Sequence, residues 1–341
     1  MAPSAISVPC VVAPVIPPFR AQEAKSSMET PGSLKLHSTG GAIEPEAVGK
    51  LRPTHMDTPL EEIRRRYNQD GYVWLKGLLP AEEIWEARKQ YFQFLAPTGL
   101  IKPNTDPKEG IYCGGDWLRW MAPGKLRDKL NLADPNPEYE KRVVDAHSAP
   151  WYIAFANHPV LKDYVKKFTG WEATTLLQRS IFRPNIPGGD TTPVHYDQIY
   201  LRAGPPTALT AWVPLGDCAL HGGGLLYLEN SVSLGQELER GFTAAAQGLT
   251  EAERLSAFNQ NMMEGGFLET DSGKFSKVWG RKWLAADYEA GDVVLHDPSI
   301  IHCSAINETD VIRLATDLRF VESGKPFDER WMKIWSPDDG L

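Results

Sequence analysis

The tripeptide His195-Tyr196-Asp197 places an imidazole and a carboxylate two positions apart, a spacing that suits a metal ion. Side chains alternate between the two faces of a strand, so on a strand His195 and Asp197 would point the same way, roughly 7 Å apart. A third ligand is available in His302, which ends the run Gly291-Asp-Val-Val-Leu-His-Asp-Pro-Ser-Ile-Ile-His302. Two histidines and one carboxylate leave positions open on the metal. This ligand set is typical of non-haem Fe(II) sites that also hold a cosubstrate and oxygen.

A second match to the same short pattern, His55-Met56-Asp57, lies directly before a predicted helix. Asp57 is better explained as an acidic residue at a helix start, where the helix dipole favours a negative charge. Chance matches to so short a motif are expected in a chain with eight histidines. We therefore predict the metal site at His195 and not at His55.

Ser304 and Arg313, which both follow His302 in the sequence, could bind a carboxylate. Ser304 follows His302 by two positions and shares its strand face, and Arg313 lies on the next predicted strand. Arginine pairs with carboxylates through two parallel hydrogen bonds, and a hydroxyl adds a third donor. This spacing favours a dicarboxylate that binds the metal at one end and Arg313 at the other.

The chain divides into an N-terminal arm and an ordered part whose helices and strands would position these residues. Residues 1–57 are rich in Pro, Ser, Gly and Ala, so we expect a disordered arm. Order is expected to begin with a capping box in which Thr58 is the N-cap and Glu61 reaches back to it. Helices are predicted at 58–68, 80–94, 138–147 and 159–169, and strands at 71–76, 176–182, 192–201, 207–215, 224–228, 292–295 and 311–321.

This order predicts one domain over 58–341, mainly β with flanking helices. Helical support would occupy 58–170, and a jelly-roll core would occupy 171–322 with an insertion at 231–285.

Composition excludes several classes of protein. The 341 residues carry a net charge of −8, which argues against a nucleic-acid-binding surface, and no apolar stretch is long enough to predict a transmembrane helix. The four cysteines are widely spaced with no CxxC pair, which fits a reducing compartment better than a zinc site or a disulfide framework. We expect a cytoplasmic protein with a small-molecule substrate and neither nucleic acid nor membrane as partner. The oligomeric state stays open.

Several motifs in a fixed order resemble the phytanoyl-CoA dioxygenase type of Fe(II)/2-oxoglutarate oxygenase. The likeness runs over residues 67–320. Besides His195-Tyr-Asp it includes Asp70-Gly-Tyr-Val-Trp-Leu, Leu177-Gln-Arg-Ser-Ile-Phe-Arg-Pro, Ala211-Trp-Val-Pro-Leu-Gly-Asp and Gly222-Gly-Gly-Leu-Leu-Tyr-Leu. The chain departs from the family at Tyr196, where members often have Gln, and at Cys303, where a small residue is common. Alternation points both side chains away from the metal, so the departures leave the ligands unaffected.

The resemblance implies a double-stranded β-helix, a cupin-like jelly roll, with Fe(II), 2-oxoglutarate and O₂ as its cofactor and cosubstrates. It implies His195, Asp197 and His302 as iron ligands. It places Arg313 and Ser304 on the distal carboxylate of 2-oxoglutarate, with Gln178 and Trp212 lining the same pocket.

Other charged residues invite weaker hypotheses. Arg319 shares a strand face with Arg313, and Arg202 follows the His-x-Asp segment, so either could contact an anionic substrate. His296 and Asp297 lie on the segment that leads to His302, where a turn or a hydrogen bond to a ligand fits better than direct ligation.

We therefore predict a dioxygenase that oxidises an unactivated C–H bond of a small organic molecule, with succinate and CO₂ as co-products. Hydroxylation is the default outcome, and desaturation, ring closure or epoxidation would use the same residues. A secondary metabolite, an amino-acid derivative or an acyl compound would suit the partly apolar segments around the site. Two alternatives stay open: a metal-dependent cupin-type isomerase or dioxygenase without 2-oxoglutarate, and a non-catalytic binding module on the same scaffold.

Overall fold

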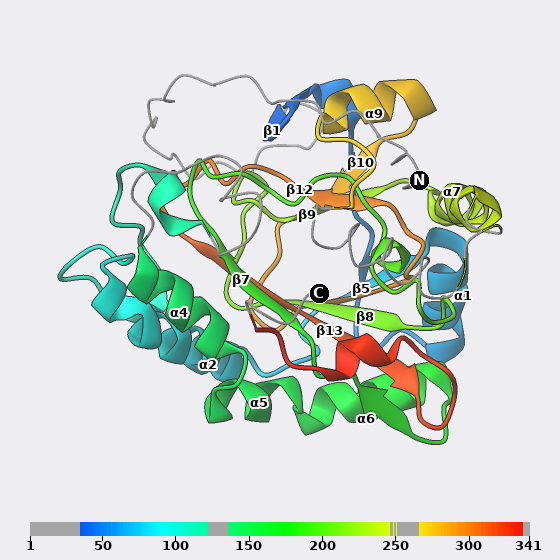
Figure 1. Cartoon of the computed structure of the whole chain (residues 1–341), viewed down its shortest axis with the longest axis horizontal. Helices are drawn as coiled ribbons and strands as arrows, with labels where there is room; N and C mark the ends of the chain where they lie inside the picture. Colours follow the sequence, from blue (N-terminus) through cyan, green and yellow to red (C-terminus); the bar gives the residue numbers. More distant parts are fainter. Residues whose placement is uncertain (1–34, 122–135, 246–247, 249, 251–265, 337–341) are drawn as a thin grey trace, which may run out of the picture.

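The computed structural model describes residues 35–121, 136–245, 248, 250 and 266–336, and β-strands form its centre (Figure 1). The strands are β1 (Leu36–Ser38), β2 (Gly41–Ile43), β3 (Val48–Lys50), β4 (Pro53–Thr54), β5 (Tyr72–Leu75), β6 (Thr174–Leu176), β7 (Ile181–Asn185), β8 (Leu209–Pro214), β9 (Leu225–Leu228), β10 (Trp283–Ala285), β11 (Val293–His296), β12 (His302–Ser304) and β13 (Arg313–Glu322). A seven-stranded sheet has the order β4-β5-β11-β8-β13-β6, with β7 also paired to β13. A four-stranded sheet has the order β12-β9-β10-β3, and β1 pairs with β2.

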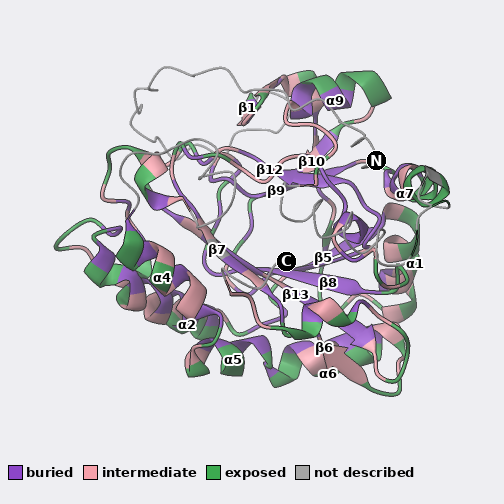
Figure 2. Cartoon of the chain, in the orientation of Figure 1, coloured by how far each residue is buried: buried purple, intermediate pink, exposed green. Residues whose placement is uncertain are grey.

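The two larger sheets pack against each other, as the strand pattern predicts for a jelly roll. One buried apolar cluster joins Trp74, Trp212 and Val294 of the seven-stranded sheet to Leu225 and Tyr227 of the four-stranded sheet. The predicted double-stranded β-helix is therefore confirmed as the fold class. Figure 2 shows the central strands, such as β8 and β9, buried throughout, whereas the helices are buried on one side only.

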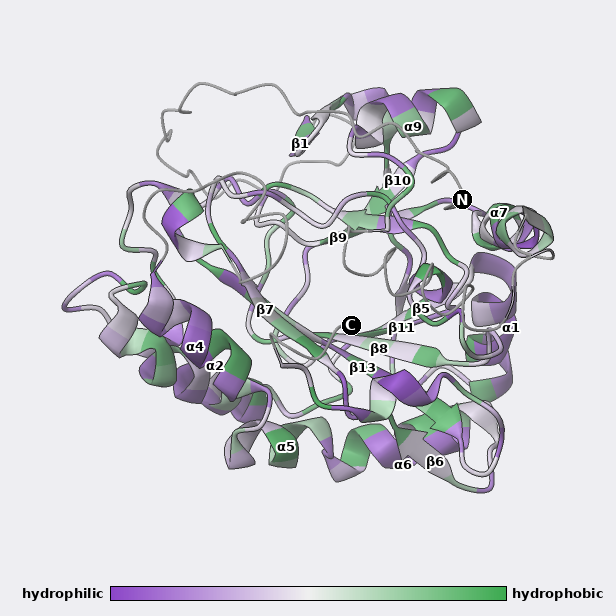
Figure 3. Ribbon diagram, in the orientation of Figure 1, coloured by the Kyte–Doolittle hydropathy of each residue, from purple (hydrophilic) through white to green (hydrophobic). Residues whose placement is uncertain are grey.

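Helices cover the outer face of the seven-stranded sheet, where α2, α4, α5 and α6 lie side by side in Figure 1. The helices are α1 (Leu60–Asp70), α2 (Ala81–Leu95), α4 (Pro137–Ala146), α5 (Pro150–Ala156), α6 (Pro159–Thr169), α7 (Val232–Ala245) and α9 (Ser272–Trp279). Short 3₁₀ turns are η2 (Pro45–Ala47), η3 (Ala96–Thr98), η4 (Pro107–Glu109), η5 (Trp117–Trp120), η6 (Asp197–Ile199) and η7 (Glu329–Met332). Hydrophobic and hydrophilic residues alternate around α2, α4 and α6 (Figure 3), so each buries one apolar stripe in the cluster beneath the sheet.

Alternation along the strands separates the helix-covered face from the face that carries the site. In β8, Ala211 and Val213 belong to the cluster that includes the helices, whereas Trp212 belongs to the cluster between the sheets. In β13, Leu314 and Leu318 pack toward the helices and Ala315 packs between the sheets. The residues of β8 and β13 that share a face with Trp212 and Ala315 therefore point into the interior of the jelly roll.

The structure corrects the prediction that residues 1–57 form a disordered arm. Residues 1–34 lie outside the described part, but β3 runs parallel to β10 and β4 runs parallel to β5. These strands are two or three residues long, and their partners lie far along the chain. Local periodicity is therefore too short to reveal them.

The predicted capping box at Thr58 does not form. The N-cap of α1 is Pro59, with no side-chain hydrogen bond to the helix start. The backbone N–H of Thr58 instead donates to the carbonyl of His55 in a turn. The other predicted helices appear close to their expected bounds, α5 is an addition, and α7 and α9 lie within the predicted insertion at 231–285.

The segment 192–201, predicted as a strand, is mostly irregular. Isolated bridges join Val194 to Glu269 and His195 to His302, and the 3₁₀ turn η6 then begins at Asp197. The predicted insertion at 231–285 also ends inside the core, because β10 pairs with both β9 and β3. Among the described residues, no helix combines the length and apolar character that a membrane span would need.

Candidate metal centre

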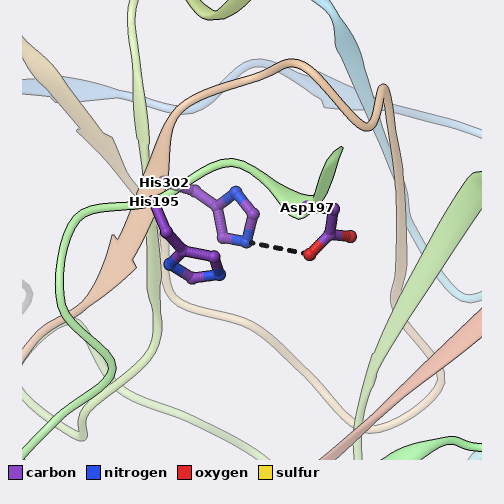
Figure 4. A group of neighbouring side chains, drawn as sticks. All are labelled: His195, Asp197 and His302. Carbon is purple, nitrogen blue, oxygen red and sulfur yellow. Dashed lines mark ion pairs between the residues drawn. The ribbon is translucent and has the colours of Figure 1, made fainter. Parts of the chain in front are cut away.

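His195, Asp197 and His302 come together in the interior, and all three are buried (Figure 4). One ligand atom from each lies within 4.8 Å of the others, close enough to surround one ion. The two histidines are joined through their backbones, since the N–H of each donates to the carbonyl of the other at 3.0 and 2.8 Å. This bridge links the irregular segment before η6 to β12, so two distant parts of the chain position the imidazoles.

Hydrogen bonds fix the orientation of both imidazoles. Nδ1 of His195 lies 2.8 Å from the carbonyl of Pro193, and Nδ1 of His302 lies 3.0 Å from the carbonyl of Ile300. A carbonyl only accepts, so each Nδ1 carries the proton and each Nε2 keeps its lone pair for a metal. Burial, followed by the nearby His195 and His296, holds the pKa of His302 well below its usual value. The His302 imidazole is therefore neutral, as metal binding requires.

Asp197 is almost completely buried, and its two carboxylate oxygens have different surroundings. Oδ2 accepts from Thr210 Oγ1 at 2.5 Å and lies 3.2 Å from His296 Nε2. Oδ1 lies 3.9 Å from Nε2 of His302, on the side of the two histidines, and accepts from Arg319 Nη2 at 2.9 Å. Burial alone would raise the pKa of Asp197, but Arg319 and His296 hold it well below its usual value. The carboxylate is therefore ionised and oriented.

The donor set fits Fe(II). Two imidazole nitrogens and one carboxylate oxygen, gathered on one side of a site, form the facial triad that leaves positions open for other ligands. Histidines that donate their second nitrogen to a backbone carbonyl are the usual arrangement around protein-bound metals.

Ser304 and Arg313 lie on strands that border the same interior. The Ser304 hydroxyl follows His302 on β12, is buried, and has no hydrogen-bond partner among the described residues. Arg313 starts β13, and its Nε donates to the carbonyl of Gly223 at 2.9 Å. Burial raises the pKa of the Cys218 thiol to about 11, and Arg313 is the largest influence that lowers it.

Trp212 and Gln178 were both expected to line the cosubstrate pocket, and they have different surroundings. Trp212 is fully buried between the sheets, with its ring 4.7 Å from that of Tyr288. Gln178 lies between β6 and β7 and is exposed. Its contact with a cosubstrate stays a prediction.

Arg202 and Arg319 were both expected to contact an anionic substrate; that contact stays a prediction, and the structure pairs each of them with a carboxylate of the protein. Nε of Arg202 lies 3.0 Å from both carboxylate oxygens of Glu239 on α7, and its side chain is 4% exposed. Arg319 pairs with Asp197 and is equally buried. Both cations already have an anionic partner within the protein.

Sequence reasoning missed one residue of the site and correctly limited the role of another. Thr210, a hydrogen-bond donor to Asp197, was overlooked, although it shares a strand face with Trp212 and alternation could have revealed it. His296 was expected to support a ligand and not to bind the metal, and it lies within hydrogen-bond distance of Asp197. The competing His55 is exposed and lies outside this cluster.

Comparison with known proteins places the chain in a family. The model of the phytanoyl-CoA dioxygenase (PhyH) family matches residues 67–315. Phytanoyl-CoA dioxygenase domain-containing protein 1 of Danio rerio is 22% identical over 305 residues, which span 84% of this chain and 96% of that protein. The 1-deoxypentalenic acid 11-beta-hydroxylase of Streptomyces arenae is 28% identical over 212 residues, 58% of this chain and 66% of the relative.

Among solved structures, the epimerase SnoN, crystallised with Fe³⁺, alpha ketoglutarate and nogalamycin RO, is similar at 18% identity and a TM-score of 0.46. The match covers 77% of this chain and 84% of that chain. That TM-score is low, so the assignment depends on the family match and on the chemistry of the site. The chain belongs to the phytanoyl-CoA dioxygenase family and is an Fe(II)- and 2-oxoglutarate-dependent oxygenase.

Proposed function

We propose that the protein hydroxylates an unactivated C–H bond of a small, partly apolar molecule, with His195, Asp197 and His302 as the Fe(II) ligands. The observation that carries the assignment is the buried triad with both Nδ1 atoms committed to backbone carbonyls. Desaturation, cyclisation or epoxidation would need the same residues. The hydroxylase of Streptomyces arenae among the relatives favours hydroxylation and a role in secondary metabolism.

Arg313 and Ser304 would hold the distal carboxylate of 2-oxoglutarate. A guanidinium forms two charge-assisted hydrogen bonds to a carboxylate, and the bond from Arg313 to Gly223 fixes the direction of its side chain. The Ser304 hydroxyl, which lacks a partner among the described residues, would gain an acceptor. The 2-oxoacid end of the cosubstrate would then reach the metal.

Iron, 2-oxoglutarate and O₂ together supply the oxidant for the C–H bond and release succinate and CO₂. The protein contributes orientation and a dry surrounding. The inter-sheet cluster around Trp212 and Tyr227 excludes water next to the triad, which limits side reactions. The substrate would enter on the open side of the metal, opposite the three protein ligands.

The test is an anaerobic titration of the Fe(II)-loaded protein with 2-oxoglutarate, read by the visible charge-transfer absorption of the chelate. We expect a saturable band in the native protein and in His55→Ala, and loss of both the band and Fe(II) binding in His195→Ala. Iron binding without a band would favour an isomerase or dioxygenase that needs no 2-oxoglutarate. No iron binding in the native protein would favour a binding module.

Once the band is established, release of succinate identifies the substrate. Apolar secondary metabolites, amino-acid derivatives and acyl compounds are added in turn, and the correct substrate raises succinate release above the uncoupled rate.

A further inference from the structure

The guanidinium of Arg319 makes a two-point ion pair with the carboxylate proposed as an iron ligand. Nη2 lies 2.9 Å from Oδ1 of Asp197, and Nε lies 3.3 Å from Oδ2. Both side chains are buried, with 4% and 1% of their surface exposed. Water is largely excluded at such a site, so the two charges compensate each other. Burial lowers the pKa of Arg319, but Asp197 first and Asp317 next hold it above its usual value.

Arg319 is also held from its other side. Its guanidinium carbon lies 4.6 Å from the ring of Trp331 in η7, and Trp331 Nε1 donates to the carbonyl of Tyr200 at 3.0 Å. Nη1 of Arg319 is buried and has no hydrogen-bond partner among the described residues. The guanidinium is therefore fixed in place, and Asp197 is its ion-pair partner.

The two oxygens of Asp197 are not equivalent in this arrangement. Oδ2 has three neighbouring donors: Thr210, His296 and Nε of Arg319. Oδ1 has Nη2 of Arg319 and faces His302. A metal ion bound by the triad would therefore coordinate Oδ1, the oxygen that Arg319 already contacts.

Orientation of Asp197 does not depend on Arg319 alone. If the arginine were removed, Thr210 and His296 would still hold Oδ2 in place. What would be lost is the positive charge. Removal of Arg319 would therefore separate the effect of charge from the effect of orientation.

We propose that Arg319 is a built-in counter-ion that stabilises Asp197 when no metal is bound and weakens the affinity of the site for divalent metal. This inference rests on the proposed role of Asp197 as a ligand. A divalent ion on Oδ1 and the guanidinium would share one carboxylate and repel each other across a few ångströms, and at an effective dielectric constant of about 20 this repulsion reduces affinity by more than tenfold. The same arginine keeps the metal-free site from holding an unpaired buried anion.

The test is the affinity for Co(II), measured through its visible absorption, together with the melting temperature of each variant with and without the metal. Arg319→Gln should bind Co(II) at least about tenfold more tightly than the native protein. Without metal, Arg319→Gln should also melt at a lower temperature than the native protein. Saturating Co(II) should reduce this difference in melting temperature. Arg202→Gln loses an arginine–glutamate pair whose arginine is as buried as Arg319, and it should bind Co(II) within about twofold of the native protein.

Thr210→Val tests orientation without a change in charge. It removes one donor to Oδ2 and should weaken Co(II) binding. If Arg319→Gln also bound Co(II) as weakly as Thr210→Val, or no more tightly than the native protein, the counter-ion role would be wrong. Failure of the native protein to bind Co(II) would instead overturn the ligand assignment, and the inference with it.

A double variant covers the case in which Arg319→Gln does not fold. Asp197→Asn alone removes the carboxylate that pairs with the buried Arg319, whereas Asp197→Asn with Arg319→Gln leaves two neutral amides. We expect the double variant to melt at a higher temperature than Asp197→Asn without metal. A lower melting temperature in the double variant would show that Arg319 contributes packing and not charge compensation.

Discussion

The ion pair between Arg202 and Glu239 joins α7 to the segment that carries the proposed metal ligands. Glu239 Oε2 also accepts from the hydroxyl of Tyr196, the residue between His195 and Asp197. The Arg202 guanidinium lies 4.1 Å from the ring of Phe242 on the same helix. Glu239→Gln keeps the shape of the side chain and removes its charge, so it tests whether this pair stabilises the fold.

The expected loss of stability follows from how deeply the Arg202 and Glu239 side chains are buried. Removal of one partner from a fully buried ion pair costs about 3–5 kcal/mol, because the other charge is left without compensation. The Arg202 side chain is 4% exposed and that of Glu239 is 20% exposed, so solvent reduces the loss. We expect Glu239→Gln to lower the free energy of unfolding by about 2–3 kcal/mol. Arg202→Met should lower the free energy of unfolding by about the same amount. The loss in the double variant should be smaller than the sum of the two single losses by about 1.5–2 kcal/mol.

The assay is urea unfolding of the metal-free native protein, both single variants and the double variant. Glu237→Gln is the matched control, because Glu237 is an exposed residue on the same helix, and its effect should stay within about 0.5 kcal/mol. Additive losses in the double variant would refute the pairing. A Glu239→Gln variant as stable as the control would show that Arg202 needs no partner, which would favour its role as a contact for an anionic substrate.

Three further predictions concern the site and its support. Arg313→Gln should leave Co(II) binding intact but weaken 2-oxoglutarate binding by about 30- to 150-fold in calorimetry, since truncating one partner of a charge pair costs about 2–3 kcal/mol; unchanged affinity would contradict its role. The pKa of His302 is depressed, so below pH 6.5 the unfolded chain takes up a proton that the folded metal-free protein does not. Its stability should fall as the pH drops from that value, by at most about 1.4 kcal/mol per pH unit for this group, and His302→Asn should flatten the dependence. The hydroxyl of Tyr152 lies 2.7 Å from Ser180 Oγ and 2.6 Å from Thr316 Oγ1 in the core. Tyr152→Phe should therefore lower the free energy of unfolding in urea by about 1–3 kcal/mol. An unchanged stability would mean that the hydroxyls of Ser180 and Thr316 bond to each other in the variant.

Local patterns were sufficient for the longer helices and for the longest strand. The apolar spacing within 80–94 and 159–169 predicted α2 and α6 closely, because each helix buries a single stripe that recurs every three or four residues. The alternating run at 311–321 likewise predicted β13, whose ten residues make it long enough for a period of two to be visible. Short strands such as β3 and β4 lack that length, and only their pairing with β10 and β5 defines them.

The residues of the proposed metal site could also be identified from the chain, but their geometry could not. His195 and Asp197 were expected to share a strand face, whereas Asp197 opens a 3₁₀ turn after a single bridge. The side chains that the spacing singled out do come together, but for a different structural reason: the turn directs Asp197 toward His302.

The sequence by itself determined the fold class, the family and the identities of the candidate ligands, because these follow from residue types at short, fixed spacings. The tertiary structure alone decided what surrounds those ligands. Thr210, His296 and Arg319 converge on Asp197 from β8, β11 and β13, strands that are neighbours in the sheet but distant along the chain. Charge compensation in a buried site depends on distances of a few ångströms, and only the packing of the strands sets those distances.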